Sequence, residues 1–476
     1  MSRFRERKPR NSLAGSEVTL PEGALNMNKQ GCRFGVFASL IAFALSAFAG
    51  GVPIDSGELG ARLDDYLRPY VAAKDFSGVV LIAQGNTILA EKTYGKADFE
   101  RNVPNRTQTA FRIASLSKTF TAGAIAMLIE RGKVGLDDPL QRYLPDFPNG
   151  EKITVKNLLL HQSGVGQLTS PELLRDCFSI PELVSRLAKV PPQFAPGTTN
   201  RYSNEGYLLL AAIVEKASGT SYKSFLSKNI FKPLGMKHTG TMCTTWPVSE
   251  HSNGYISGLG RGVARLPFNQ AGWDGPGSIY STAGDLYLWL KALSANRLFH
   301  FDQLAYPYGW GKRDYSGRKL VEQSGQLRGF TAEMAFYPQE KLFLVYLSNI
   351  ESGLFNRTPK DFEAVMFGGT PSTPPSVTEA PASFEELAVY VGAYSTAAVP
   401  VPMELVVRDG HLWMNWAGDQ LLRPLIRTGK DEFFFRAEYA SVRFERNADR
   451  GVASAAWKWG DGQPLILERV TGSQTR

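Results

Sequence analysis

Apolar and polar positions near the start of the chain first follow a helical period and then a strand period. Leucines four residues apart predict an amphipathic helix over residues 55–73. Two short apolar runs then follow, over residues 79–83 and 87–92, with Gly85 and Asn86 between them. A Gly-Asn pair between two such runs is typical of a tight turn, so this segment predicts a β-hairpin.

The middle of the chain is helical and its later part returns to strands. A near-continuous apolar stretch over residues 119–131 predicts a buried helix, and residues 207–217 predict another. Strand-like runs reappear over residues 330–337 and 342–347. Strands therefore bracket a helical region. We expect an α+β fold, in which an antiparallel sheet built from both ends of the domain is flanked by helices, with a helical region inserted.

The C-terminal part has a different pattern. Residues 369–382 are rich in Pro, Ser and Thr, as in a linker. Ser383 and Glu386 then form a capping-box pattern at a helix start. The rest alternates apolar and polar residues, so residues 383–476 predict a small antiparallel β-barrel whose aromatic residues form its core. The predicted domains are residues 50–368, the linker, and this barrel.

Composition and charge exclude some classes of function. The 476 residues are 43% hydrophobic and 21% charged, which is ordinary globular composition. The formal net charge is +8, but residues 1–49 hold seven Lys and Arg against three acids and so account for +4 of it. The other basic residues are dispersed along the chain. This distribution does not indicate nucleic-acid binding, and we expect a small molecule or peptide as the substrate.

The N-terminal segment has the features of an export signal. A short basic region after Met27 precedes an apolar run over residues 34–48, which is too short to span a bilayer comfortably. Ala47 and Ala49 form an A-x-A cleavage pattern. We therefore predict a signal peptide over residues 1–49 and a periplasmic or extracellular protein. Residues 1–26 are either a spurious extension or a long basic region, and an uncleaved membrane anchor is the alternative.

Cysteine and histidine usage predicts no metal site. Cys32 lies within the predicted signal peptide, and Cys177 and Cys243 are expected to be buried free thiols, with a disulfide as the alternative. The five histidines have none of the spacings typical of metal ligands. We expect neither a metal nor a cofactor.

A Ser-x-x-Lys sequence at Ser115 and Lys118 is the strongest candidate for chemistry. A serine hydroxyl needs a neighbouring base to act as a nucleophile. A lysine three residues later in a helix lies on the same face, so these two side chains can meet locally. We predict Ser115 at the N-terminus of the buried helix, where the helix dipole favours a developing negative charge. Alone, the pattern is more typical of a helix cap and a solvated lysine than of a catalytic pair.

Three further segments turn this pattern into a candidate active site. Tyr202 and Asn204 form a Tyr-x-Asn sequence before a helix. A phenolate stabilised by the lysine ammonium would take the serine proton and return it to the leaving group, while Asn204 would orient Lys118 or donate to the substrate. Gln323, Ser324, Gly325 and Gln326 lead into a strand, where the N–H of Gln326 would join that of Ser115 in an oxyanion hole. His161 lies in a helix-end turn and is interpreted as structural.

These motifs, in this order, resemble the serine β-lactamase and penicillin-binding-protein superfamily, and more closely the class C β-lactamase-like hydrolases. The resemblance covers about residues 55–365 and includes residues 158–164, 275–285 and 308–311. The C-terminal domain is similar to the lipocalin-like extensions of some of these hydrolases. The resemblance implies an acyl-enzyme on Ser115, with Lys118 as its activating partner and Tyr202 as general base and acid. It also implies that Asn204, Gln323, Ser324, Gly325 and Gln326 bind substrate.

One position departs from the family pattern. The third motif usually begins with Lys or His, whereas here Gln323 offers hydrogen bonds but no charge. Losing a charge-assisted bond weakens carboxylate binding by about 1.5–3 kcal/mol. We therefore expect an esterase or amidase for less charged substrates. The alternatives are a D-alanyl peptidase or penicillin-interacting protein in which Arg328 supplies the missing charge, and a binding or scaffold protein without turnover.

Overall fold

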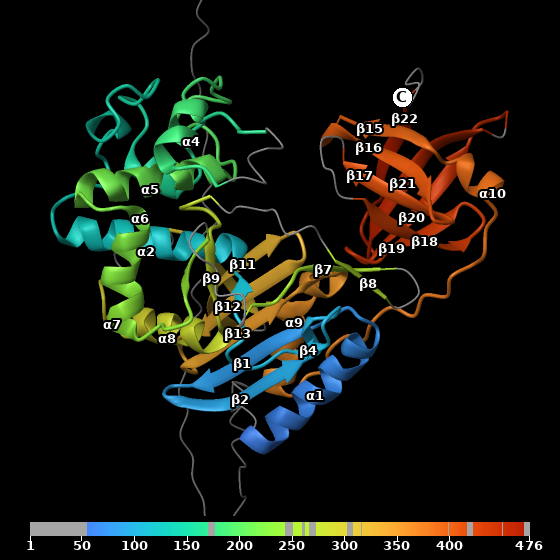
Figure 1. Cartoon of the computed structure of the whole chain (residues 1–476), viewed down its shortest axis with the longest axis horizontal. Helices are drawn as coiled ribbons and strands as arrows, with labels where there is room; N and C mark the ends of the chain where they lie inside the picture. The colour runs from blue at the N-terminus through green and yellow to red at the C-terminus, as the bar shows by residue number, and fades with distance from the viewer. Residues whose placement is uncertain are drawn as a thin grey trace, which may run out of the picture. The chain divides into compact units, whose positions relative to one another are not determined.

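Two β structures organise the chain, a six-stranded antiparallel sheet and a closed barrel (Figure 1). The computed structural model describes residues 55–169, 177–242, 251–258, 262–265, 273–301, 308–315, 317–397, 399–416, 422–449 and 451–470. The predicted signal peptide lies outside these residues. The α+β fold class and the C-terminal barrel predicted from the sequence are both confirmed.

The six-stranded sheet joins strands from both ends of the predicted domain of residues 50–368. Its strands in spatial order are β10 (Gly311–Tyr315), β11 (Arg318–Leu327), β12 (Phe330–Tyr337), β13 (Leu342–Ser348), β1 (Gly78–Gln84) and β2 (Thr87–Tyr94). Strands β1 and β13 pair antiparallel, with Val80 opposite Tyr346. The predicted hairpin is β1 and β2, and Gly85 in its turn has a φ of 56°. The sheet is therefore built from both ends, as the hydrophobic pattern indicates.

Alternate residues of β1 face two separate cores, because successive side chains of a strand point to opposite faces. Val80 and Ile82 pack with helices α1 (Ser56–Ala72) and α9 (Thr358–Phe367). Val79 and Leu81 pack with the inserted helical region. This explains why β1 is apolar on both faces, and why its sequence is a continuous apolar run.

The inserted region holds the helices and short strands between β2 and β10, drawn from light blue to yellow in Figure 1. Its longer helices are α2 (Ser117–Glu130), α4 (Ile180–Leu187), α5 (Asn204–Ser218) and α8 (Ala283–Ser294). Shorter elements are α3 (Val155–Leu159), α6 (Tyr222–Leu226), α7 (Lys232–Leu234), β3 (Lys96–Asp98), β4 (Val103–Pro104), β5 (Phe111–Arg112), β6 (Gly240–Thr241), β7 (Tyr255–Ser257), β8 (Val263–Arg265) and β9 (Ile279–Ser281).

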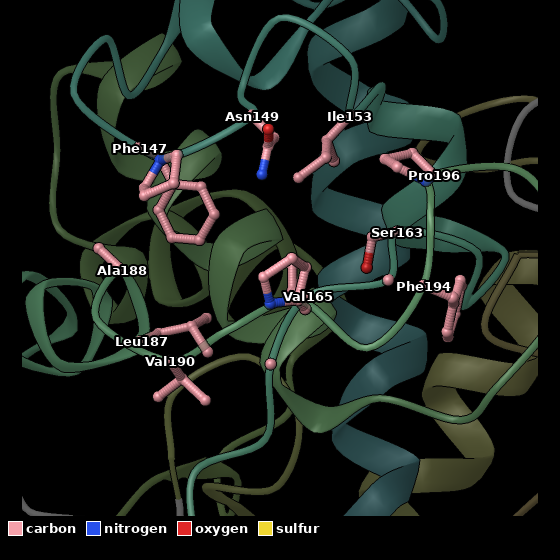
Figure 2. A pocket seen from close by; sticks show the side chains of 14 residues that line it. Phe147, Asn149, Ile153, Ser163, Val165, Leu187, Ala188, Val190, Phe194 and Pro196 are labelled. Carbon is pink, nitrogen blue, oxygen red and sulfur yellow. The ribbon is translucent and has the colours of Figure 1, made fainter.

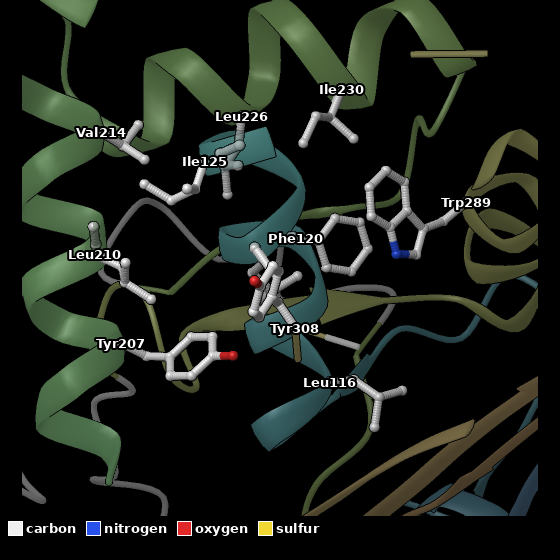
Figure 3. Packing of buried hydrophobic residues seen from close by; sticks show 14 of the residues in the cluster. Leu116, Phe120, Ile125, Tyr207, Leu210, Val214, Leu226, Ile230, Trp289 and Tyr308 are labelled. Atoms are coloured by element: carbon white, nitrogen blue, oxygen red, sulfur yellow. The ribbon is translucent and has the colours of Figure 1, made fainter. Parts of the chain in front are cut away.

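Helix α2 is the centre of this region. Every residue from Ser117 to Leu128 is buried, which accounts for the unbroken apolar stretch in its sequence. Figure 3 shows Phe120 of α2 beside Trp289 of α8, and their ring centroids lie 4.6 Å apart in a stacked arrangement. Tyr207 and Leu210 of α5 belong to the same core. The packing holds α2 and α5 together, and the predicted catalytic residues lie in or directly before these two helices.

The barrel closes on itself through eight strands in chain order. They are β15 (Gly392–Thr396), β16 (Val399–Arg408), β17 (His411–Trp416), β18 (Arg423–Gly429), β19 (Glu432–Phe435), β20 (Ala440–Arg446), β21 (Val452–Trp459) and β22 (Leu465–Arg469). Helix α10 (Phe384–Ala388) precedes them and has the predicted capping box between Ser383 and Glu386. Aromatic side chains fill the barrel core, among them Tyr394, Phe444 and Trp457.

The prediction of a buried free thiol is wrong for Cys177, which is disulfide-bonded. The sequence left this open because the spacing of two cysteines does not determine whether they meet in space. Among the helices that the structure describes, none is long and apolar enough to cross a membrane.

Candidate active site

Ser115 lies in a short 3-10 turn, η1 (Ala114–Leu116), directly before α2. The sequence predicts Ser115 as the start of the buried helix, but α2 begins at Ser117. Ala114, the first residue of this turn, has a left-handed φ of 48°. A non-glycine residue rarely adopts this conformation, and such strain is common beside reacting groups. The turn therefore presents Ser115 outside the regular hydrogen-bond ladder of α2.

Lys118 meets Ser115 as the spacing predicts. Its Nζ donates to Ser115 Oγ at 3.1 Å, to Asn204 Oδ1 at 2.8 Å and to the carbonyl oxygen of Pro276 at 3.2 Å. Its side chain is fully buried. Three oxygen partners fix the position of Nζ. Lys118 is therefore a buried, hydrogen-bonded residue of the site and not a solvated surface lysine.

Tyr202 completes the contact with Ser115. Its Oη lies 2.6 Å from Ser115 Oγ, and Lys118 Nζ lies 4.7 Å from the centre of its ring. Ser203 caps α5 by accepting from the backbone N–H of Gly206. This cap sets where α5 begins, and so places Tyr202 just before the helix and Asn204 at its first turn. The structure thus brings all four predicted residues of the two helical motifs together.

His161 supports the tyrosine loop. Its Nδ1 accepts from the backbone N–H of Ser203 at 3.0 Å, and its carbonyl oxygen accepts from Arg201 at 2.9 Å. Its ring centroid lies 4.7 Å from that of Tyr202 and 5.1 Å from that of Tyr207. Burial, with a smaller effect of the Lys118 charge, lowers the pKa of His161 to about 4, so the ring is neutral. These contacts agree with the structural role expected from the sequence.

Burial sets the protonation of the catalytic pair. It lowers the pKa of Lys118 to about 7, although the nearby Glu205 carboxylate opposes this shift. Burial also raises the pKa of Tyr202, and Glu205 adds to this effect while the Ser115 hydrogen bond opposes it. Near neutral pH the free amine of Lys118 is therefore accessible. Tyr202 is 58% exposed to solvent, which weakens the effect of burial on its phenol. The lowered pKa of Lys118 makes its amine a second candidate for the base, beside Tyr202.

Gly325 allows strand β11 to pass directly against the nucleophile turn. A Cβ on this residue would lie 2.4 Å from the carbonyl oxygen of Ile113 and 2.9 Å from the backbone nitrogen of Ser115. Contacts below 3.0 Å do not occur for real Cβ atoms, so only glycine fits here. The next residue, Gln326, lines the pocket that contains Ser115. The close approach of β11 to the Ser115 turn therefore explains why residue 325 is a glycine.

The described hydrogen bonds of the Gln323 side chain go to backbone groups, and not to Ser115, Lys118 or Tyr202. Its Nε2 donates to the carbonyl oxygen of Gly309 at 2.7 Å, and its Oε1 accepts from the backbone N–H of Ser324 at 2.9 Å. Gly309 itself packs against α2, because a Cβ there would lie 3.2 Å from the carbonyl oxygen of Lys118. Gln323 therefore braces the Gly309 segment, and the Ser324 side chain is exposed.

A pocket of about 220 Å³ opens on Ser115. It is lined by Ala114, Ser115, Gln167, Leu168, Asn204, Glu205, Trp273, Pro276, Gly277, Gln326 and Leu327. Glu205 is the one ionisable carboxylate among these lining residues, and its Oε1 accepts from the backbone N–H of Leu168 at 3.0 Å. Sequence reasoning missed Glu205 and Trp273. Glu205 directly follows the Tyr-x-Asn motif, and this position next to the predicted site residues could have indicated that it lines the pocket.

A second pocket lies among apolar residues of the inserted region, away from the predicted site residues. Figure 2 shows Ser163 between Val165, Phe194 and Ile153 in its wall. The Ser163 hydroxyl is buried and forms no hydrogen bond within the described part of the chain. No group of three or more His, Cys, Asp or Glu residues suited to a metal occurs in the residues that the structure describes.

The chain is similar in sequence to a known family and to known proteins. The protein-family model described as Beta-lactamase matches residues 63–364. Penicillin-binding protein 4* of Bacillus subtilis (strain 168) is 30% identical over 438 residues, which cover 82% of this chain and 95% of that protein. Esterase EstB of Burkholderia gladioli is 33% identical over 208 residues, covering 39% of this chain and 53% of the esterase.

Solved structures agree with this assignment. The crystal structure of a penicillin-binding protein from Bacillus halodurans matches with a TM-score of 0.56 and 26% sequence identity, over 65% of this chain and 99% of that protein. The fold, the matched family and the relatives therefore agree. The chain belongs to the beta-lactamase family, within the superfamily of serine β-lactamases and penicillin-binding proteins.

Proposed function

We propose that this protein hydrolyses esters or amides through an acyl-enzyme formed on Ser115. The observation that carries the proposal is the position of Ser115 Oγ, 2.6 Å from Tyr202 Oη and 3.1 Å from Lys118 Nζ. A hydroxyl between a neutral amine and a phenol has an acceptor for its proton and a donor for the leaving group.

The proposed reaction proceeds in two halves. Lys118 Nζ accepts the Ser115 proton while Oγ attacks the carbonyl carbon, and the resulting oxyanion faces the backbone N–H groups of Ser115 and Gln326. The bond to the leaving group breaks as Tyr202 donates its proton, which Lys118 restores. Water then attacks the acyl carbon, its proton passes to the Lys118–Tyr202 pair, and Ser115 regains a proton as the acid product leaves.

The pocket favours acyl donors without a negative charge. Apart from Lys118, the residues around Ser115 supply no cation in the described lining, and Glu205 adds a carboxylate. The amide of Gln323 is already bound to Gly309 and Ser324. A substrate carboxylate would find no charged partner here and would be repelled by Glu205. The similarity to an esterase supports the same substrate class.

A D-alanyl peptidase is the second candidate, because the similarity to penicillin-binding protein 4* extends over 82% of the chain. In that case Arg328 would supply the charge for the substrate carboxylate. Hydrolysis of D-alanyl peptides that is lost in Arg328→Ala would support the peptidase. Equal hydrolysis in both proteins would support a peptidase that does not depend on Arg328, whereas no hydrolysis by wild type would favour the ester or amide hydrolase.

The test of the proposed function is acylation of Ser115. Wild type should form an adduct with a fluorophosphonate probe and hydrolyse p-nitrophenyl acetate, whereas Ser115→Ala should do neither. Ser294→Ala, a change of an exposed serine at the end of α8, is the matched control and should behave as wild type. Absence of both adduct and turnover in wild type, together with saturable ligand binding, would replace the proposal with a binding protein.

We also propose export to the periplasm or the extracellular space. The signal pattern over residues 1–49 supports it, and so does the disulfide at Cys177, since disulfides persist in oxidising compartments. N-terminal sequencing of the protein from its native host should find Gly50 as the first residue. A start at Met1 or Met27 on an intracellular protein would contradict the proposal.

A further inference from the structure

A buried carboxylate anchors the barrel to residues 55–368, which we call the hydrolase region. Residues 50–476 form one compact unit, and Asp75 within it is fully buried. Its Oδ1 accepts from Arg436 Nε at 2.7 Å, and its Oδ2 accepts from Arg436 Nη2 and from Tyr439 Oη, each at 2.8 Å. Ser257 adds a bond at 2.9 Å. A paired arginine and further donors compensate the buried charge, so this anchor is specific.

A second barrel arginine reaches toward the active site. Arg423 Nε of β18 lies 3.3 Å from Glu351 Oε1, and Glu351 belongs to β14 (Ile350–Glu351). The other oxygen of the same carboxylate, Oε2, accepts from the backbone N–H of Gly329 at 3.2 Å. Gly329 lies in the turn between β11 and β12, and Gln326 and Leu327 directly precede that turn and line the pocket. One carboxylate therefore links the barrel to the pocket edge.

The Gly329 turn is also confined by close packing. Its φ is 76°, and a Cβ there would lie 2.7 Å from Gly254 Cα and from the backbone nitrogen of Tyr255. Tyr255 begins β7, which pairs in parallel with β14. The next residue of β7, Ile256, packs within the barrel core. Both structures that confine the turn, β7 and Glu351, are therefore themselves in contact with the barrel.

We propose that the barrel acts as a positioning domain, in which Arg423 holds Glu351, Glu351 holds the Gly329 turn, and the turn fixes the Gln326–Leu327 edge of the active site. Arg423 and Glu351 touch no reacting atoms and are positioning residues. Without Arg423, the buried Glu351 carboxylate loses its cation and is favoured to turn toward water. The turn then loses its acceptor, and the backbone of Gln326 is less well fixed. The kinetic test of this proposal requires the proposed hydrolysis, whereas the positioning role itself does not.

Two barrel arginines make a matched test. Arg423→Met and Arg436→Met each remove one largely buried arginine that pairs with a carboxylate of the hydrolase region. Only the carboxylate of Arg423 contacts the Gly329 turn. We expect Arg423→Met to slow acylation by p-nitrophenyl acetate by about 10–100-fold, mainly in kcat, as for a misplaced catalytic group. Arg436→Met should lower the melting temperature, with acylation within about twofold of wild type below that temperature.

Arg423→Lys keeps the charge and should restore part of the rate, since a lysine ammonium can still pair with Glu351. Hydrogen exchange of the peptide containing Gly329 provides a readout that needs no activity. The Gly329 amide should exchange faster in Arg423→Met and Arg423→Lys than in wild type. Its exchange rate in Arg436→Met should equal that of wild type. Wild-type exchange and wild-type acylation in Arg423→Met would overturn the proposal. Equal losses in Arg423→Met and Arg436→Met, compared at equal stability, would also overturn it.

An inactive wild type would refute the proposed hydrolysis without deciding the positioning role, which the exchange measurement then decides. If Arg423→Met does not fold, Arg423→Lys carries the same comparison with the same two readouts. Faster Gly329 exchange in that folded variant supports the proposal, and protection equal to wild type rejects it.

Discussion

The two walls of the active site are built on different physical principles. On the helical wall, Ser115, Lys118, Tyr202 and Asn204 meet through their side chains at 2.6–3.1 Å. On the strand wall, β11 contributes a glycine that lets its backbone approach Ser115, and its Gln323 side chain is bound elsewhere. The helical wall therefore depends on residue identity. The strand wall depends on backbone position, which explains how it can carry an uncharged glutamine at residue 323.

The largest expected effect comes from the helical wall. Lys118→Met removes the proton acceptor of Ser115 and keeps most of the buried volume. We expect the acylation rate to fall on the order of 10³-fold, as for loss of a general base. Stopped-flow acylation by p-nitrophenyl acetate measures this rate. A variant that keeps a tenth of the wild-type rate would remove Lys118 from the mechanism and leave Tyr202 as the base.

The strand wall should be most sensitive at Gly325. In Gly325→Ala the new Cβ would lie 2.4 Å from the Ile113 carbonyl oxygen, so β11 or the Ser115 turn must shift. A displacement of this kind should lower kcat by about 100-fold. Gly284→Ala is the matched control, because a Cβ there meets nothing within 4 Å. If both variants retain wild-type kcat, the strand wall does not depend on the close approach of its backbone.

The sequence predicts the helical wall better than the strand wall, and the reason is the range of the interactions. Ser115 and Lys118 are three residues apart, so helix geometry alone brings them together. The hairpin of β1 and β2 and the alternation along the barrel strands are equally local signals. These features were predictable because each depends on neighbours in the chain.

The features that were missed depend on distant contacts. Gln323 is held by Gly309, fourteen residues away, and the lowered pKa of Lys118 follows from burial that no motif contains. Ala114 carries no residue-level signal of a left-handed φ, since this conformation usually favours glycine or asparagine. Cys177 likewise forms a disulfide that spacing alone could not assign.

His161 tests how the helical wall is held. His161→Phe keeps an aromatic ring beside Tyr202 and Tyr207 but removes the acceptor for the Ser203 N–H. Leaving this amide unpaired costs about 1–3 kcal/mol of stability. We expect kcat to fall by about tenfold with KM nearly unchanged, because Tyr202 is less well placed. His161→Asn, which restores an acceptor and tolerates a positive φ, should recover part of kcat. A change confined to stability would make His161 purely structural.

The charge of Glu205 should set the pH dependence of the helical wall. Because the amine form of Lys118 is the proposed base and its pKa is about 7, acylation should rise as pH increases through 7 and then level off. Glu205 raises the pKa of Lys118, so Glu205→Gln should move this midpoint to lower pH and increase the rate at pH 6 a few-fold. Measuring kcat/KM from pH 5 to 9 for both proteins gives the shift. A midpoint that moves upward would contradict the assignment of Lys118 as the base.

The smallest effect is expected at Gln323, and it sharpens the contrast between the walls. Gln323→Leu removes the bond to the Gly309 carbonyl oxygen and should cost about 1 kcal/mol of stability. Since the amide is already bound to Gly309 and Ser324, kcat/KM should fall only about two- to threefold. The fall should be equal for p-nitrophenyl acetate and for a p-nitrophenyl ester that carries a carboxylate. A selective loss for the carboxylate-bearing ester would show that Gln323 binds substrate, and that the strand wall also acts through its side chains.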